Sequence, residues 1–147
     1  MRYLVMNESD VEEIARLYMD YYNHHEGGCW QYEKAYKRIH QTVTMEDSLC
    51  LIQKDDESHT TGFAMGHFKE FDDLSMYYLE EIVIFSEYQN KGYGKQFLNE
   101  IEKRILEYGA AHIELTCVND AHHMHFYQGF GMCEAPHLRI MAKHYER

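Results

Sequence analysis

The sequence has a single proline, Pro136, and no glycine-, serine- and proline-rich stretch that would mark a linker between domains. It also lacks an internal repeat and a low-complexity segment. At 147 residues we expect one domain, spanning residues 1–147, that is long enough to bury a core. Apolar residues make up 45% and charged residues 27%, which is typical of a globular chain and argues against disorder.

No apolar run is long enough to cross a bilayer, so we expect no membrane association. The first ten residues, MRYLVMNESD, contain no apolar core of a secretory leader, which favours a cytoplasmic location. The four cysteines form no C-x-x-C pair, so neither a zinc site nor a redox motif is indicated. We therefore expect four reduced thiols.

Basic residues are scarce: 14 Lys and Arg stand against 25 Asp and Glu, a formal net charge of −11. Binding to phosphate backbones needs a basic surface, so this balance argues against nucleic acid as the main partner. It suits a cationic partner better, although acidity alone often serves only solubility.

Hydrophobic periodicity and turn residues predict alternating strands and helices without strict βαβ repetition. The class is therefore α/β, or α+β with a mixed sheet. Strands are expected at residues 3–6, 48–53, 62–71, 77–85, 112–118 and 137–142, and helices at 11–22, 31–44, 95–108 and 121–128.

The most informative segment is the glycine loop, residues 89–95 (QNKGYGK), which follows the apolar strand and opens a long helix. Glycines there allow close approach to a ligand, and the free amides of a helix N-terminus favour an anion. Lys91 and Lys95 add local positive charge. Neither the G-x-G-x-x-G fingerprint nor a P-loop is present, and a tight turn with no ligand remains an alternative.

Q-N-K-G-Y-G after L-E-E-I-V-I resembles the Q/R-x-x-G-x-G/A signature of the GNAT superfamily of N-acetyltransferases. Residues 119–132 are similar to the family's second segment, N-x-x-A…F-Y-x-x-x-G-F. They depart from it by one extra residue between Asn119 and Tyr127 and by an early glycine. The resemblance implies the GNAT acyl-CoA N-acyltransferase fold, with a central, mostly antiparallel sheet flanked by helices.

The resemblance also implies acetyl-CoA as the acetyl donor, direct attack of an amine on the thioester, and no metal. Tyr127 matches the tyrosine that protonates the departing thiolate, a general-acid role; a core aromatic is the alternative. The positions that match cofactor-binding residues are Ile82, Ile84, Gln89, Asn90, Lys91, Gly92, Tyr93, Gly94, Lys95 and Asn119.

An alkyl amine with a pKa of about 10.4 is neutral in only about one molecule in 10³ at pH 7, a deficit of roughly 4–5 kcal/mol, so a general base is needed. Glu80 and Glu81 lie on the strand before the glycine loop. Neighbours on a strand point to opposite faces, so only one should face the acceptor. We favour Glu80 slightly; a solvated carboxylate or an ion pair is the alternative for either residue.

The resemblance places the acceptor near the N-terminal helices, where aromatic rings and carboxylates suit a cationic amine. Ordinary helix packing is the alternative for most of these residues. The candidates for substrate binding are Tyr22, His25, Glu26 and Trp30.

The expected function is thus N-acetylation of a primary amine, with a polyamine, an aminoglycoside and an amino-acid-like amine all open as acceptors. A protein N-acetyltransferase and a non-catalytic CoA-binding or sensor module are the alternatives. His122, His123 and His125 make a metal-binding protein a further, weaker alternative. A homodimer through the C-terminal strands is expected from the family alone.

Overall fold

The computed structural model describes all 147 residues. They form two compact units, Met1–Thr116 and Cys117–Arg147, which are described separately.

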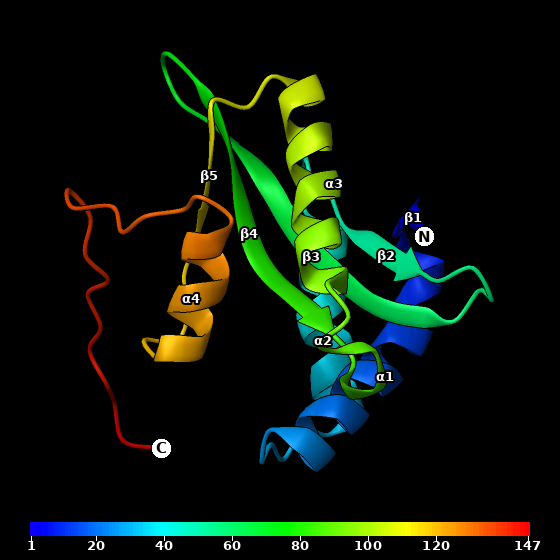
Figure 1. Cartoon of the computed structure of the whole chain (residues 1–147). Coiled ribbons are helices and arrows are strands. Elements are labelled where there is room, and N and C mark those ends of the chain that lie inside the picture. Colours follow the sequence, from blue (N-terminus) through cyan, green and yellow to red (C-terminus); the bar gives the residue numbers. More distant parts are fainter. The chain divides into compact units, whose positions relative to one another are not determined.

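The first unit is built on a five-stranded sheet whose strands lie in chain order (Figure 1). Strands β1 to β4 pair antiparallel, and β5 pairs parallel with β4. This confirms the predicted mixed, mostly antiparallel sheet. The strands are β1 (Arg2–Val5), β2 (Leu51–Lys54), β3 (Thr60–Glu70), β4 (Ser75–Ile84) and β5 (His112–Leu115).

Helices cover both faces of this sheet (Figure 1). Helices α1 (Val11–His25) and α2 (Tyr32–Val43) lie on one face, and α3 (Tyr93–Tyr108) lies on the other. Short 3-10 turns precede α1 and α3, at Glu8–Asp10 and Ser86–Tyr88. The predicted end of this helix at residue 22 is wrong, because α1 continues to His25 and ends where Glu26 N–H donates to the Tyr22 carbonyl at 3.1 Å.

Alternation along the strands divides the core between the two faces. Ile52, Phe63 and Val83 pack with Ile14 and other residues of α1 and α2 in one cluster. On the other face, α3 buries its apolar side, and the Phe97 ring meets the Tyr3 ring edge-on with centroids 5.3 Å apart. The buried residues of α3 are Phe97, Leu98, Ile101 and Ile105, as its periodicity predicts.

The regular pairing of β3 with β4 is interrupted by a bulge at Glu80. Met65 pairs with Glu81, but the next residue of β3, Gly66, pairs with Leu79, so Glu80 has no partner across the ladder. A bulge redirects the side chains beside it and breaks the strict alternation of faces.

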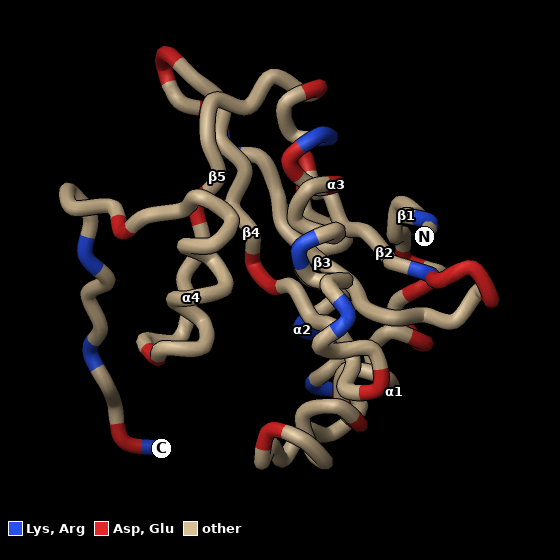
Figure 2. Tube along the Cα trace, in the orientation of Figure 1, with Lys and Arg blue, Asp and Glu red and all other residues tan.

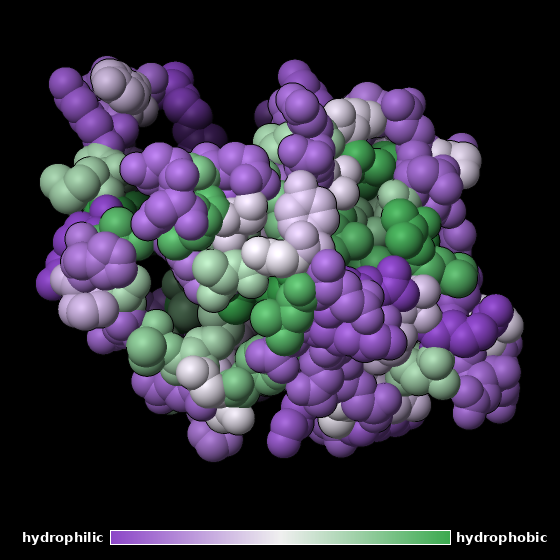
Figure 3. Space-filling model, turned by 90° about the horizontal axis from the view of Figure 1, so that it is seen from above, coloured by the Kyte–Doolittle hydropathy of each residue, from purple (hydrophilic) through white to green (hydrophobic).

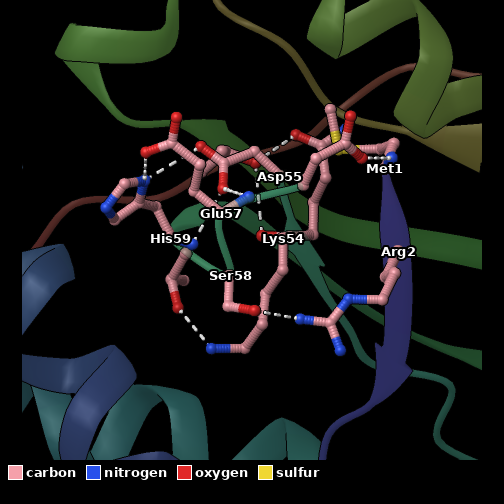
Figure 4. Close-up of polar contacts among 11 residues, drawn as sticks. Met1, Arg2, Lys54, Asp55, Glu57, Ser58 and His59 are labelled. Atoms are coloured by element: carbon pink, nitrogen blue, oxygen red, sulfur yellow. Dashed lines mark hydrogen bonds and ion pairs between the residues drawn. The ribbon is translucent and has the colours of Figure 1, made fainter.

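The hairpin between β2 and β3 ends in an acidic turn held by its own polar contacts (Figure 4). Asp55 accepts from the backbone N–H groups of Glu57 and His59, at 3.0 and 2.9 Å. The Arg2 side chain of β1 donates to the Ser58 hydroxyl at 2.6 Å. These contacts tie the turn to the edge strand of the sheet.

The second unit contains one helix, α4 (Ala121–Gly129), close to the predicted 121–128. The predicted strand at 137–142 is wrong: no strand forms there, and Leu138, Ile140 and Met141 are exposed. A strand needs a neighbour to pair with, and this unit contains no second strand. The apolar residues of this segment therefore did not by themselves determine a strand.

All four cysteines are free thiols, as expected. None of the helices has the length and apolar character needed to cross a membrane. Viewed from above, hydrophobic patches interrupt a mainly hydrophilic surface (Figure 3), and in the first unit Phe71 and Leu106 are exposed.

Candidate functional site

The glycine loop turns sharply through two residues with left-handed backbone conformation. Asn90 has φ of 61° and Gly92 has φ of 80°. A Cβ added at Gly92 would meet nothing within 4 Å, so open space lies beside this turn. The glycine is therefore required by its backbone conformation and leaves room for a ligand.

The first turn of α3 presents unpaired amides. The first intrahelical bond is donated by Gln96 to the Gly92 carbonyl at 3.1 Å, and no side chain caps the helix start. The N–H groups of Tyr93, Gly94 and Lys95 are thus free of intrahelical acceptors. The first turn contains no acidic residue. These features fit a phosphate group, because free amides and the helix dipole both favour an anion.

A buried amide that sequence reasoning missed fixes this helix start to the sheet. Gln53 of β2 is fully buried, and its Nε2 donates to the Tyr93 carbonyl at 3.0 Å and to the Tyr3 hydroxyl at 3.2 Å. Its Oε1 accepts from the Thr61 hydroxyl at 2.6 Å. A glutamine inside an apolar strand, S-L-C-L-I-Q, was the available signal.

The charges around the glycine loop are mixed (Figure 2). The Lys91 ammonium lies 5.8 Å from the Tyr88 ring centroid. The pKa of Tyr88 is raised by burial and by the charges of Glu87, Asp55 and Glu57. The acidic β2–β3 turn is therefore within electrostatic reach, and anion affinity at this loop must come mainly from direct contact with the amides.

Strand β4 has an unpaired edge beside the loop. Pairing with β5 ends at Leu79 and Leu115, whereas β4 continues to Ile84 with β3 as its only partner. Ile82 and Ile84 lie in this part, and alternate backbone groups there face away from β3. The Ile84 carbonyl already accepts from Gln89 Nε2 at 2.8 Å.

Glu81, one of the two candidate bases, is the centre of a hydrogen-bonded network. The Arg38 Nη2 and Nε donate to its Oε2 at 3.0 and 3.2 Å. The Tyr18 hydroxyl donates to the same oxygen at 3.2 Å, and the Tyr22 hydroxyl donates to Oε1. Burial and the charge of Glu81 raise the pKa of both phenols, so they stay protonated and act as donors. The ion pair that was one alternative for this carboxylate is present.

Glu80 differs from its neighbour: it is partly exposed, and its carboxylate forms no hydrogen bond or ion pair. Its charge acts on His67 of β3, where burial and Lys69 lower the pKa of the imidazole and Glu80 opposes that change. The His67 and Tyr78 rings are 5.9 Å apart. Glu80 is therefore close enough to His67 to act on its charge. The expectation that neighbouring glutamates point to opposite faces assumes regular pairing, and pairing is not regular at this bulge.

The four predicted acceptor residues all lie at the end of α1 and in the α1–α2 loop, residues 26–31. Trp30 is partly buried, with its ring centroid 5.1 Å from that of Tyr18. His25 contacts the Ser86 hydroxyl at 3.1 Å, and Glu26 accepts from the Tyr21 hydroxyl at 2.8 Å. Both are exposed.

Asn23, which sequence reasoning missed, closes the α1–α2 loop. Its Oδ1 accepts from Trp30 N–H at 2.7 Å and its Nδ2 donates to the Trp30 carbonyl at 2.9 Å. The Gly28 N–H also donates to the Tyr22 carbonyl at 2.9 Å. The loop is thus folded back on the end of α1 and holds Trp30 against Tyr18.

In the second unit, Asn119 is exposed just before α4, and Asp120 caps the helix by accepting from His123 N–H at 2.7 Å. Tyr127 lies on α4 with its ring 5.0 Å from Phe126. The His123 ring contacts Asp120 at 2.8 Å. No group of three or more His, Cys, Asp or Glu side chains is placed to hold a metal ion.

A family model described as "Acetyltransferase (GNAT) family" matches residues 11–132. This range contains the glycine loop, both β4 glutamates and Tyr127. None of the curated proteins matches the chain in sequence.

Solved structures resemble the chain over nearly its whole length. A Clostridium difficile 630 protein described as a possible acetyltransferase has 13% identity and a TM-score of 0.82, covering 99% of this chain and 98% of that one. A ribosomal-protein-alanine N-acetyltransferase from Brucella melitensis biovar Abortus 2308 has 12% identity and a TM-score of 0.75, covering 97% and 98%. An aminoglycoside N-acetyltransferase in complex with CoA has 14% identity and a TM-score of 0.74, covering 97% and 93%. At these identities the likeness shows the fold alone.

Proposed function

Because the chain belongs to the acetyltransferase (GNAT) family, we propose that it transfers the acetyl group of acetyl-CoA to the primary amine of a small cationic molecule. The observation that carries this proposal is the unpaired Glu80 carboxylate at the β4 bulge. It lies where the outer edge of β4 becomes free, on the same strand that leads into the glycine loop.

The glycine loop is the proposed pyrophosphate site. The amides of Tyr93, Gly94 and Lys95 point out of the α3 start, and the Lys91 and Lys95 ammonium groups add charge. The free edge of β4 at Ile82 and Ile84 offers backbone groups to the pantetheine arm, and Asn119 is assigned to the same arm by its motif position. When bound, acetyl-CoA supplies the thioester carbonyl that the amine attacks.

Glu80 is the proposed general base. It removes a proton from the acceptor ammonium and so offsets the roughly 4–5 kcal/mol cost of forming the neutral amine at pH 7. Glu81 is poorly suited to this task, because its two oxygens already accept hydrogen bonds from Arg38, Tyr18 and Tyr22. Tyr127 is the proposed general acid for the departing thiolate, on the evidence of its motif alone.

Aromatic rings of Tyr22 and Trp30, with Glu26 and His25 at the exposed rim, are the proposed acceptor wall. Rings and a carboxylate favour a cation. Polyamines, aminoglycosides and amino-acid-like amines are the classes to screen. The likeness to a ribosomal-protein-alanine N-acetyltransferase supports a protein amino group as the second candidate.

The first test is thermal unfolding with and without acetyl-CoA. Ligand at 100 times its Kd adds about 2.7 kcal/mol, a shift of several degrees for a domain of this size. No shift at millimolar ligand contradicts the pyrophosphate site. A shift without thiol release across the amine and peptide screens favours instead a CoA-binding module that does not catalyse transfer.

The second test compares Glu80→Gln with Glu81→Gln using an amine found in the screen. Glu80→Gln is expected to lower kcat/KM by about 10²-fold at pH 7, with activity regained as pH rises and the free amine becomes abundant. Glu81→Gln is expected to lower the midpoint of unfolding and to leave that pH profile unchanged. If Glu81→Gln alone changes the profile, the assignment of the base is reversed.

A further inference from the structure

A single phenol links the glycine loop to the α1–α2 loop. Tyr21 of α1 donates its hydroxyl proton to Glu26 Oε1 at 2.8 Å and accepts from Gln89 Nε2 at 3.0 Å. Gln89 is the first residue of the glycine loop, and Glu26 is the first residue of the α1–α2 loop. The two loops are therefore joined through one side chain.

Gln89 has no spare proton for a ligand in this arrangement. Its Nε2 donates both to Tyr21 and, at 2.8 Å, to the Ile84 carbonyl. The side chain thus holds the strand end, the glycine loop and α1 together. It determines where the loop amides lie but does not itself point an unpaired donor at a phosphate.

The Tyr21 ring is fixed in place by its neighbours. Its centroid is 5.1 Å from the Tyr22 ring, 5.9 Å from the His25 ring and 6.1 Å from the Phe85 ring. Burial and the hydrogen bond to Glu26 raise the pKa of Tyr21 to about 12, so the hydroxyl remains a donor at neutral pH. A ring held in this way, with hydrogen bonds to both loops, is a physical path by which a shift of one loop can move the other.

We propose that Tyr21 is a positioning residue that couples acetyl-CoA binding at the glycine loop to the position of the acceptor wall on the α1–α2 loop. This inference rests on the proposed function. It predicts that the acceptor is bound more tightly by the acetyl-CoA complex than by the free protein. By linkage, the acceptor then raises the affinity for acetyl-CoA by the same factor.

Trp30, the chain's single tryptophan, lies on the α1–α2 loop. Its fluorescence therefore reports the position of this loop, and the measurement needs no identified acceptor. In the unmodified protein, acetyl-CoA is expected to change Trp30 emission and its quenching by acrylamide. Tyr21→Phe keeps the ring and removes both hydrogen bonds. Loss of the neutral bond from Gln89 to Tyr21, the one on the glycine-loop side, should lower acetyl-CoA affinity about fivefold and reduce the Trp30 response at saturating ligand.

The contact between Ser86 and His25 is a second link nearby, because it joins the 3-10 turn just before the glycine loop to the last residue of α1. Adding Ser86→Ala to Tyr21→Phe is therefore expected to abolish the remaining Trp30 response. Glu26→Gln keeps an oxygen that accepts from Tyr21 and should retain the response, whereas Glu26→Ala should reduce it. Tyr36→Phe is the matched control, because Tyr36 is a partly buried tyrosine of α2 that packs against the core and the Tyr32 and His40 rings, away from the glycine loop.

The outcomes separate the two proposals. If acetyl-CoA gives no thermal shift with the unmodified protein, the proposed function fails. If it binds but leaves Trp30 unchanged, or if Tyr21→Phe binds acetyl-CoA and responds like the unmodified protein, the coupling role is overturned while the proposed function stands.

Discussion

The two faces of the sheet both bury polar groups, but of different kinds. Beneath α1 and α2 the network is charged, with Glu81 paired to Arg38 and hydrogen-bonded to Tyr18 and Tyr22. Beneath α3 it is neutral, with Gln53 joined to Thr61 and to the Tyr93 carbonyl.

This difference suits the two proposed ligands. A neutral anchor under the glycine loop puts no charge in contact with the positive end of α3, which stays available to a phosphate. On the acceptor side, Arg38 neutralises Glu81 and leaves Glu80 as the unpaired carboxylate of β4. Each buried network thus holds the elements around it in place and leaves the groups proposed to bind acetyl-CoA or the amine unpaired.

The largest expected effect comes from adding a side chain at Gly66, on the α3 face, where no room exists for a Cβ. A Cβ there would lie 2.4 Å from the Tyr78 carbonyl oxygen and 2.4 Å from the Tyr77 hydroxyl, which donates to the Leu49 carbonyl. Gly66→Ala should cost about 3 kcal/mol of unfolding free energy or prevent folding. Urea unfolding measures this. Gly129→Ala, where nothing lies within 4 Å of the added Cβ, should leave stability nearly unchanged.

The next effect comes from breaking the charged network. Arg38→Met removes the cation while Glu81, with a side chain only 13% exposed, stays charged. We expect a loss of about 2 kcal/mol in urea unfolding, because a nearly buried carboxylate loses its partner. Replacing both residues, as Arg38→Met with Glu81→Met, should recover much of it. A double variant no more stable than Arg38→Met would mean that Arg38 acts by packing.

Gln53→Leu is expected to have a smaller effect on stability but also to weaken acetyl-CoA binding. It leaves the Tyr93 carbonyl without the Gln53 donor, at a cost of about 1–2 kcal/mol, while the Thr61 hydroxyl can still donate to the backbone carbonyl of residue 53, which lies 3.2 Å away. The start of α3 should then shift, so acetyl-CoA affinity falls in calorimetric titration. Gln96→Leu, at an exposed position of α3, is the control and should alter neither quantity. Unchanged acetyl-CoA affinity in Gln53→Leu would show that the Gln53 side chain does not position the glycine loop for binding.

The smallest effect concerns pH on the α1 and α2 face. Burial and Lys69 lower the pKa of His67 below its ordinary value of 6.5, against the pull of Glu80. The unfolded chain therefore binds a proton that the folded chain does not, and His67 lowers stability as pH falls through about 6.5. His67→Asn should flatten the stability curve between about pH 7.5 and pH 5.5 in urea titrations. If stability falls with pH as steeply in His67→Asn as in the unmodified protein, groups other than His67 cause the loss of stability in acid.

Local patterns in the sequence predicted much of this architecture. The apolar spacing that predicted a helix at residues 95–108 placed the end of α3 correctly and its start two residues late, because this signal depends on neighbours within one turn. The strand before the glycine loop was recognised for the same reason. Each of these elements is determined by residues close in the chain.

Features that depend on distant partners could not be read in this way. The choice between Glu80 and Glu81 depends on a one-residue slip against Met65 and Gly66, which alternation along β4 does not reveal. Arg38 finds Glu81 across 43 residues, and Gln53 finds Tyr93 across 40. The expected strand at residues 137–142 is wrong for a related reason, since its own residues supply no partner strand.

Each strand of the sheet pairs with the strand made just before it, because the spatial order is also the chain order. During synthesis the sheet can therefore grow from one side without waiting for later sequence. Tyr18, Tyr22, Arg38 and Glu81 have all been made before the glycine loop begins at residue 89. The hydrogen-bonded network around Glu81 can thus assemble before the glycine loop is free to fold.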